Sequence, residues 1–176
     1  VPLRPGHLPV IPILDRLRSA FNVGNILRIA EAVRAEAVFT CGYTATPPHP
    51  KLAKTAMGCD RLVRCRHFAA AADAVSWLDE HDFTTYGVET VEGAPEVGTL
   101  ALRFPAAFLF GNEALGVSRA ALGRCTDVVR LPAWGQKNSI NVANCAAVVL
   151  FEALRQYGRN PQKKAAECAD DRDREN

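Results

Sequence analysis

The stretch AAFLFGNEALGVS, residues 106–118, joins a run of five apolar residues to a polar loop that begins at Gly111. A continuous apolar run of this kind is typical of a central strand in a parallel sheet, because both faces of such a strand are buried. Two other segments, NVGNILR at 22–28 and LPAWGQKNSINVA at 131–143, also follow apolar, β-rich runs. Both segments contain the same kinds of polar residue. Since α/β sheets build their sites where strands end, the three segments predict one shared site.

Strand-like and helix-like segments alternate on both sides of this stretch. The apolar pattern predicts strands over residues 9–14, 37–41, 62–67, 84–88, 106–110 and 128–131. Helical spacing predicts a first helix capped by Asn22, then helices over 69–81, 118–122 and 140–157, with Gly158 ending the last one. The proline-rich stretch TATPPHPK, residues 44–51, is expected to be a loop. The alternation indicates an α/β fold, a mostly parallel sheet with helices on both faces.

Length and composition suit one compact domain. The chain has 176 residues, of which 48% are hydrophobic, so we expect a single domain over residues 1–159. Residues 160–176 are charged and poor in large apolar side chains, and we expect this tail to be disordered. The longest apolar stretches are shorter than the roughly 20 residues of a membrane span, so no membrane association is expected.

The formal charge of +2 is weak evidence for a nucleic-acid partner. Basic residues nevertheless gather locally, at Arg16, Arg18 and Arg28, at Lys51, Lys54, Arg61, Arg64 and Arg66, and at Lys137. By themselves these residues fit a solvated charged face, whereas around one active site they would form an RNA-binding surface.

The cysteines and histidines indicate neither a disulfide framework nor a metal site. Six cysteines occur without a CxxC pair, which favours a reducing, cytoplasmic setting. The group Cys59, Cys65 and His67 lacks a fourth ligand for zinc, so no metal is expected. The sequence also contains no GxGxxG, GxxxxGK[ST], GxSxG or HExxH motif, which argues against a nucleotide-phosphate loop and a histidine-based mechanism.

The three polar segments, in this order, resemble the motifs of the SpoU/TrmH family, the RNA ribose 2′-O-methyltransferases of the SPOUT superfamily. The resemblance runs from about residue 9 to 157. It implies a parallel sheet whose C-terminal part is tied in a deep trefoil knot, a homodimer, and S-adenosylmethionine as methyl donor. Periodicity and spacing do not reveal a knot, which is rare among protein folds.

The resemblance also implies roles for particular residues. The positions that match the donor-binding positions of the family are Val88, Gly111, Leu131, Ser139 and Ile140. The positions that match its catalytic or site-organising polar residues are Asn22, Arg28, Glu113, Ser139 and Asn141. Each has a simpler alternative: helix capping for Asn22, Ser139 and Asn141, local loop hydrogen bonds for Glu113, and an exposed surface charge for Arg28.

The expected reaction is transfer of a methyl group from S-adenosylmethionine to a ribose 2′-hydroxyl of RNA. Transfer RNA is the first expected substrate and ribosomal RNA the second, and a catalytically inactive RNA-binding module of the same fold is the alternative. Because a guanidinium keeps its proton up to a pKa of about 12, we interpret Arg28 as an electrostatic stabiliser that binds an RNA phosphate. Glu113 would then hold Arg28 or Asn22 in place.

Overall fold

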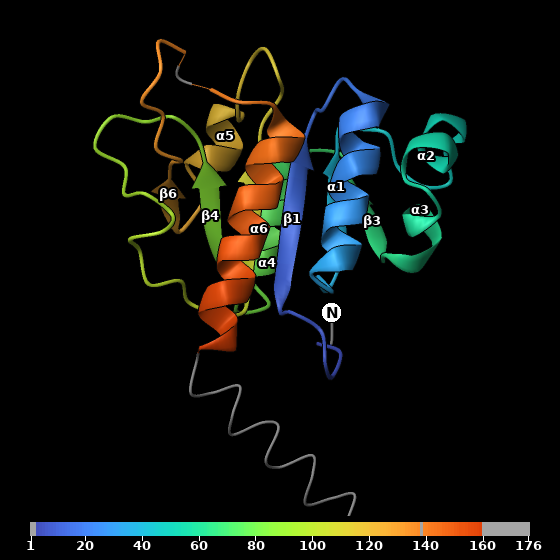
Figure 1. Ribbon diagram of the computed structural model, residues 1–176, viewed down its shortest axis with the longest axis horizontal. Coiled ribbons are helices and arrows are strands. Elements are labelled where there is room, and N and C mark those ends of the chain that lie inside the picture. Colours follow the sequence, from blue (N-terminus) through green and yellow to red (C-terminus); the bar gives the residue numbers. More distant parts are fainter. Residues whose placement is uncertain (1–2, 138, 160–176) are drawn as a thin grey trace, which may run out of the picture.

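A computed structural model describes residues 3–137 and 139–159. Its centre is a six-stranded sheet in the order β3-β2-β1-β5-β4-β6, in which every neighbouring pair is parallel. The strands are β1 (Val10–Asp15), β2 (Val38–Cys41), β3 (Cys65–Phe68), β4 (Thr84–Val88), β5 (Ala106–Phe110) and β6 (Asp127–Val129). The expected parallel α/β sheet is confirmed (Figure 1).

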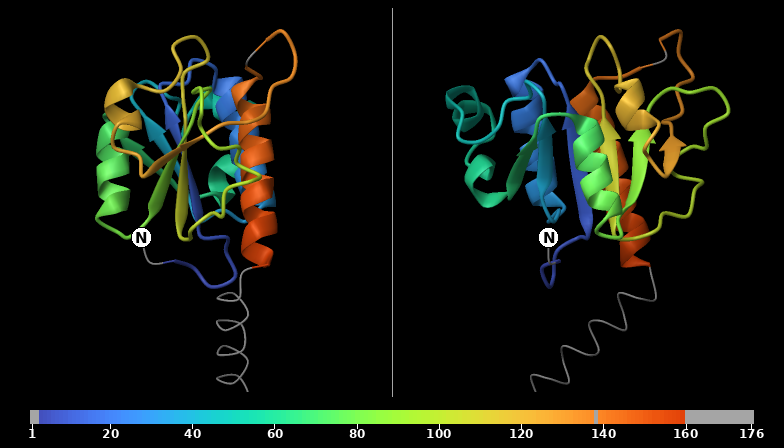
Figure 2. Two further views of the ribbon diagram at one scale, coloured as in Figure 1. Left: turned by 90° about the vertical axis from the view of Figure 1, so that its left-hand side faces the viewer. Right: turned by 180° about the vertical axis from the view of Figure 1, so that it is seen from behind.

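Helices cover both faces of the sheet, as Figure 2 shows most clearly in its left view. One face carries the long helices α1 (Ala20–Ala32) and α6 (Val142–Gly158), with the short helices α2 (Pro50–Thr55) and α3 (Cys59–Leu62) beside α1. The other face carries α4 (Ala71–Asp79) and α5 (Arg119–Leu122). Each face therefore has its own apolar core, and the side chains of a strand point alternately into one core and the other. Val10 and Leu14 of β1 pack under α1 and α6, whereas Ile11 and Ile13 pack under α4.

The central strands are as buried as the apolar runs predicted. All residues of β1 and β5 are buried, and Ile13 of β1 pairs with both Phe39 of β2 and Leu109 of β5. The bounds of β4 and β5 match the prediction, because both are short, continuous runs that end at a polar or glycine residue. Strand β3 starts later than expected, since residues 59–62 form α3 instead.

Several expected bounds were wrong, because element ends are the part of a pattern that propensity fixes least. The structure has β1, β2, α4 and β6 at Val10–Asp15, Val38–Cys41, Ala71–Asp79 and Asp127–Val129, against expected ranges of 9–14, 37–41, 69–81 and 128–131. Helix α1 begins two residues before Asn22, and its N-cap is Ser19, whose hydroxyl accepts a hydrogen bond from the Asn22 N–H at 3.4 Å. Helix α6 begins at Val142, after Asn141, and includes Gly158 rather than ending before it. The proline-rich loop already contains the start of α2, because proline is tolerated at the first position of a helix, where its missing N–H has no partner to lose.

The expected disordered tail, 160–176, lies outside the described residues. Within the described ranges, no helix has the length and apolar character needed to cross a membrane.

Candidate functional site

A pocket of about 690 Å³ opens at the carboxyl ends of β4 and β5. Its walls come from the segments that follow β4, β5 and β6 and from the start of α6. All five expected donor-binding positions line it: Val88, Gly111, Leu131, Ser139 and Ile140. Parallel strands end at the same edge of a sheet, so loops that are distant in the sequence meet there, as predicted.

Position 111 has to be a glycine, because the backbone of residues 116 and 117 packs directly against it. A Cβ atom at Gly111 would lie 2.2 Å from the Gly116 carbonyl carbon and 2.2 Å from the Val117 nitrogen. Those are backbone atoms, which cannot move aside as the end of a side chain can. Gly111 therefore allows the 111–117 loop to fold back on the end of β5.

Asn112 holds this loop in place and was missed by the sequence analysis. Its side-chain oxygen accepts hydrogen bonds from the N–H groups of Ala114 (2.8 Å) and Leu115 (3.0 Å). Its side-chain nitrogen donates to the Arg16 carbonyl at 2.7 Å and to the Tyr43 hydroxyl at 2.8 Å. Asn112 is buried with all these partners, so it fastens the second motif to the loops that follow β1 and β2.

The pocket lining carries negative charge. It includes the carboxylates of Glu89 and Glu113 and, among the lining residues, no lysine or arginine. Glu89 accepts hydrogen bonds from the N–H groups of Val117 (2.9 Å) and Thr90 (3.0 Å). Glu89 was not among the expected site residues, although its place directly after Val88 at the end of a strand was an available signal. The remaining lining is largely apolar, so the pocket suits a ligand that combines an apolar body with positive charge.

Glu113 connects this pocket to the first motif. Its carboxylate accepts hydrogen bonds from the Arg18 N–H (3.0 Å), the Ser19 N–H (3.3 Å) and the side-chain amide of Asn22 (2.8 Å). Partial burial opposes ionisation, yet these hydrogen bonds, with one from its own backbone, lower the pKa of Glu113 below its usual value. Glu113 is thus an ionised anchor at neutral pH and holds Asn22, one of the two partners expected for it.

Asn141 extends the same network to the third motif. Its side-chain nitrogen donates to the side-chain oxygen of Asn22 at 3.1 Å, and its own side-chain oxygen caps α6 by accepting from the N–H groups of Ala143 and Asn144. Asn141 therefore caps a helix and also belongs to the site. Asn141, Asn22 and Glu113 form one chain of side-chain hydrogen bonds that joins all three motifs.

Arg28 is not part of this network. It is exposed on α1 and makes no hydrogen bond or ion pair with another of the described residues. Arg28 lies six positions after Asn22 on α1, which places the two residues about 9 Å apart along the axis and about 120° apart around it. Burial raises the pKa of the Cys59 thiol on α3, Glu31 adds to the rise, and the charge of Arg28 opposes it.

The residues considered for a metal do not form a ligand set. Within the described ranges, no three histidine, cysteine or acidic residues lie close enough together to hold an ion. His67 instead shares hydrogen bonds with the hydroxyls of Thr40 and Thr46, each at 3.3 Å from its Nδ1. Burial raises the pKa of Cys65 to about 11, as expected of a buried thiol.

The fold and the site define a class: a parallel α/β protein with an acidic ligand pocket built from the loops at the carboxyl edge of its sheet. Residues 9–151 match the SpoU rRNA Methylase family. The chain belongs to that family.

Individual relatives include enzymes for both major classes of RNA. The tRNA (guanosine(18)-2′-O)-methyltransferase of Thermus thermophilus is 33% identical over 147 residues, which cover 82% of this chain and 73% of that protein. The 23S rRNA (uridine(2479)-2′-O)-methyltransferase of Streptomyces viridochromogenes is 28% identical over 160 residues, 89% of this chain and 55% of that protein.

A solved structure shares the fold over most of the chain. The SpoU methyltransferase AviRb from Streptomyces viridochromogenes, in complex with the cofactor AdoMet, superposes with a TM-score of 0.79 at 27% identity and covers 89% of this chain and 60% of that chain. The chain thus spans little more than half the length of several of the proteins it matches.

Proposed function

We propose that this protein is an S-adenosylmethionine-dependent RNA methyltransferase that acts on ribose 2′-hydroxyls. The observation that carries the proposal is that one pocket, at the ends of β4 and β5, is lined by all five expected donor-binding positions and tied to the first motif by Glu113 and Asn22. Relatives named as RNA 2′-O-methyltransferases and an AdoMet-bound neighbour support it.

The pocket residues fit S-adenosylmethionine. The donor carries a sulfonium and an ammonium group, and the carboxylates of Glu89 and Glu113 favour positive charge nearby. Val88, Leu131 and Ile140 offer apolar surface for the adenine ring. The pocket volume of about 690 Å³ lies in the range that small-molecule sites usually have. Gly111 and Ser139 would leave backbone groups open to the donor, because neither has a bulky side chain.

When bound, S-adenosylmethionine supplies a methyl group already activated on its sulfonium. The protein then has to orient one 2′-hydroxyl in line with it and to manage the hydroxyl proton. We assign the orienting role to Asn22 and Asn141, which Glu113 and the start of α6 hold in fixed positions. Glu113 is a positioning residue rather than the base, because its lowered pKa makes it a weak proton acceptor.

We keep Arg28 as an electrostatic residue of the RNA complex. A guanidinium does not act as a base at neutral pH, whereas it binds a phosphate with two parallel hydrogen bonds. Its exposure leaves it free to do so.

Transfer RNA is the proposed substrate. The Thermus thermophilus relative, which is named as a tRNA enzyme, combines 33% identity with coverage of 73% of its own length. Ribosomal RNA is the second candidate, favoured by the Streptomyces viridochromogenes relative. An inactive RNA-binding module is disfavoured, because the polar network of Glu113, Asn22 and Asn141 is complete.

We further propose a homodimer and a C-terminal trefoil knot. Helix α6 leaves Val148 and Phe151 exposed at 50% and 52% on its outer side, which a second copy would cover. The chain leaves β6 at one edge of the sheet and returns in α6 to pack against α1 and β1 near the middle, a path that is compatible with threading of the C-terminal segment.

One experiment tests the reaction. Purified protein is incubated with S-adenosylmethionine labelled in the methyl group and with either unmodified tRNA or ribosomal RNA, and the digested nucleosides are identified by mass spectrometry. We expect label in one 2′-O-methylated nucleoside from tRNA. Label on a base, or on neither RNA, would contradict the proposal, and label only on ribosomal RNA would replace the substrate.

A further inference from the structure

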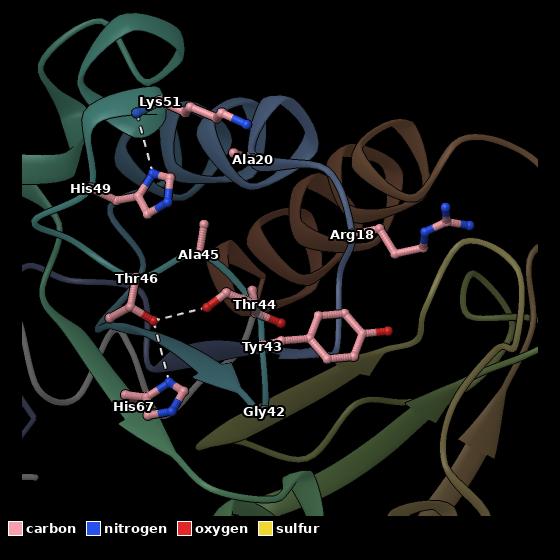
Figure 3. Close-up of a pocket in the computed structure, with 10 residues that line it drawn as sticks. All are labelled: Arg18, Ala20, Gly42, Tyr43, Thr44, Ala45, Thr46, His49, Lys51 and His67. Atoms are coloured by element: carbon pink, nitrogen blue, oxygen red, sulfur yellow. Dashed lines mark hydrogen bonds between the residues drawn. The ribbon is translucent and has the colours of Figure 1, made fainter.

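A second pocket, of about 430 Å³, lies beside the methyl-donor pocket and is built from the start of α1, the loop after β2, α2 and β3 (Figure 3). Figure 3 shows His49, Thr46 and His67 along one side and Tyr43 and Arg18 along the other. None of the functions assigned above uses it.

The two pockets have opposite charge. The second pocket is lined by Arg18 and Lys51 and by two histidines, and none of its lining residues is acidic. The donor pocket carries two carboxylates and no basic residue in its lining. A cationic ligand therefore prefers the first pocket and an anionic ligand the second.

The two pockets also share a wall. Tyr43 lines the second pocket, and its hydroxyl accepts a hydrogen bond from Asn112, which lines the donor pocket. Arg18 likewise lines the second pocket, while its N–H donates to Glu113 of the donor pocket. A ligand in the second pocket is thus a neighbour of whatever reacts in the first.

Tyr43 is a fixed and accessible aromatic surface. Its side chain is 60% exposed although its hydroxyl is tied to Asn112. Gly42 before it adopts a φ of 62°, and the buried Thr44 after it donates to the Leu14 carbonyl and accepts from the Leu17 N–H. This anchoring fixes the ring before a ligand binds, so little conformational entropy is lost on stacking.

Of the remaining polar groups, His49 can offer a donor to a base edge. The Thr46 hydroxyl donates to the Thr44 carbonyl at 3.2 Å and lies 2.5 Å from the Thr40 hydroxyl and 3.3 Å from His67 Nδ1, so contacts within the protein already satisfy it. His49 Nδ1 accepts from the Lys51 N–H at 3.2 Å, so the proton of the neutral ring sits on its Nε2 and makes it a donor.

We propose that this pocket binds the nucleotide next to the methylated one in the RNA. Its base stacks on Tyr43, its phosphate contacts Lys51, and the Nε2–H of His49 faces the base edge. An aromatic ring with nearby cations and hydrogen-bonding groups is the combination that proteins use for unstacked bases in single-stranded RNA. The inference rests on the proposed RNA substrate, and it adds a second point at which the enzyme holds the RNA beside its target.

The test compares RNA affinity in matched variants, measured by fluorescence anisotropy with the RNA that the wild-type protein methylates. We expect Tyr43→Ala to weaken binding about tenfold, the loss of one stacked base, while Tyr43→Phe stays within about threefold because the ring remains. Lys51→Ala should weaken binding and lower the salt dependence by about one ion, and Lys54→Ala, a charge on the same helix outside the pocket, should change neither. Affinity for S-adenosylmethionine should be unchanged in both lysine variants. It should be equal in the two Tyr43 variants, because both lose the same hydrogen bond to Asn112.

The outcomes separate this inference from the proposed function. One outcome would overturn only the role of the second pocket. In that outcome the wild-type protein methylates RNA, but Tyr43→Ala and Lys51→Ala both bind RNA as tightly as the wild type. Equal losses in Lys51→Ala and Lys54→Ala would also overturn it, since the effect would be one of general charge. In a further outcome, adenosine 5′-monophosphate binds as tightly as RNA and loses the same affinity in Tyr43→Ala and Lys51→Ala. That result would overturn the inference, because the ligand of the pocket would then be a free nucleotide. A wild-type protein that neither binds nor methylates RNA would remove the proposed function as well.

Discussion

Substitution of Glu113 by glutamine tests the central connection of the site. Glu113 accepts hydrogen bonds from two backbone N–H groups and from Asn22, one oxygen facing Arg18 and the other facing Ser19 and Asn22. A glutamine keeps the shape but replaces one oxygen with an NH₂ group. Whichever way it turns, at least one donor then faces another donor.

The expected cost follows from these contacts. A hydrogen bond to a charged group contributes about 1.5–3 kcal/mol when well shielded, and Glu113 is exposed at the surface, so we expect Glu113→Gln to lower the free energy of unfolding by about 1–2 kcal/mol. Asn22 would lose its fixed position, and methyl transfer should fall by about tenfold or more, because small displacements of orienting groups cost that much. Donor affinity should change less than turnover.

The pH dependence gives an independent check. Hydrogen bonding lowers the pKa of Glu113 in the folded protein, so its stabilising contribution is complete above the unfolded value of about 4.3 and is lost as the pH falls through the folded pKa. The stability difference between wild type and Glu113→Gln should therefore be full at pH 7 and shrink in strongly acidic solution. Urea unfolding at several pH values measures it.

The matched control is Glu92→Gln, which removes the same charge from an exposed residue that has no hydrogen bond or ion pair to another described residue. We expect it to behave as wild type. If Glu113→Gln unfolds at the wild-type urea concentration at pH 7 and methylates RNA at the wild-type rate, Glu113 is a surface carboxylate and the reasoning fails.

The other predictions concern packing, the role of Arg28, assembly and metal. Gly111→Ala should lower the melting temperature by several degrees, because its Cβ meets backbone atoms at 2.2 Å, whereas Gly98→Ala, with open space around it, should not; calorimetric scanning compares them. Arg28→Ala should keep donor affinity in calorimetry and lose about 10²-fold in single-turnover methylation, and an unchanged rate would make it only a surface charge. If the proposed dimer forms, Phe151→Glu should convert it into a monomer in light scattering, and a wild-type monomer at micromolar concentration would count against it. Methyl transfer should persist in excess chelator, and its loss there would overturn the metal-free reaction.

The sequence by itself determined the sheet and most of the donor pocket. Residues 106–110 form a continuous apolar run and residues 84–88 are rich in β-branched residues, so both strands could be delimited directly, and glycine and polar residues marked where they end. The family resemblance picked out Val88, Gly111 and Leu131, and because carboxyl ends of parallel strands share one edge, these residues line one pocket.

Only the tertiary structure decided which side chains meet. Ser19 rather than Asn22 caps α1. The position of a cap depends on backbone geometry, and residue propensities do not locate it to a single residue. Asn22 is thereby free to join Glu113, 91 positions later in the chain, a contact that local sequence cannot encode. The second pocket around Tyr43 likewise follows from how helices and loops pack, because its lining comes from α1, the loop after β2, α2 and β3, which meet only in the folded chain.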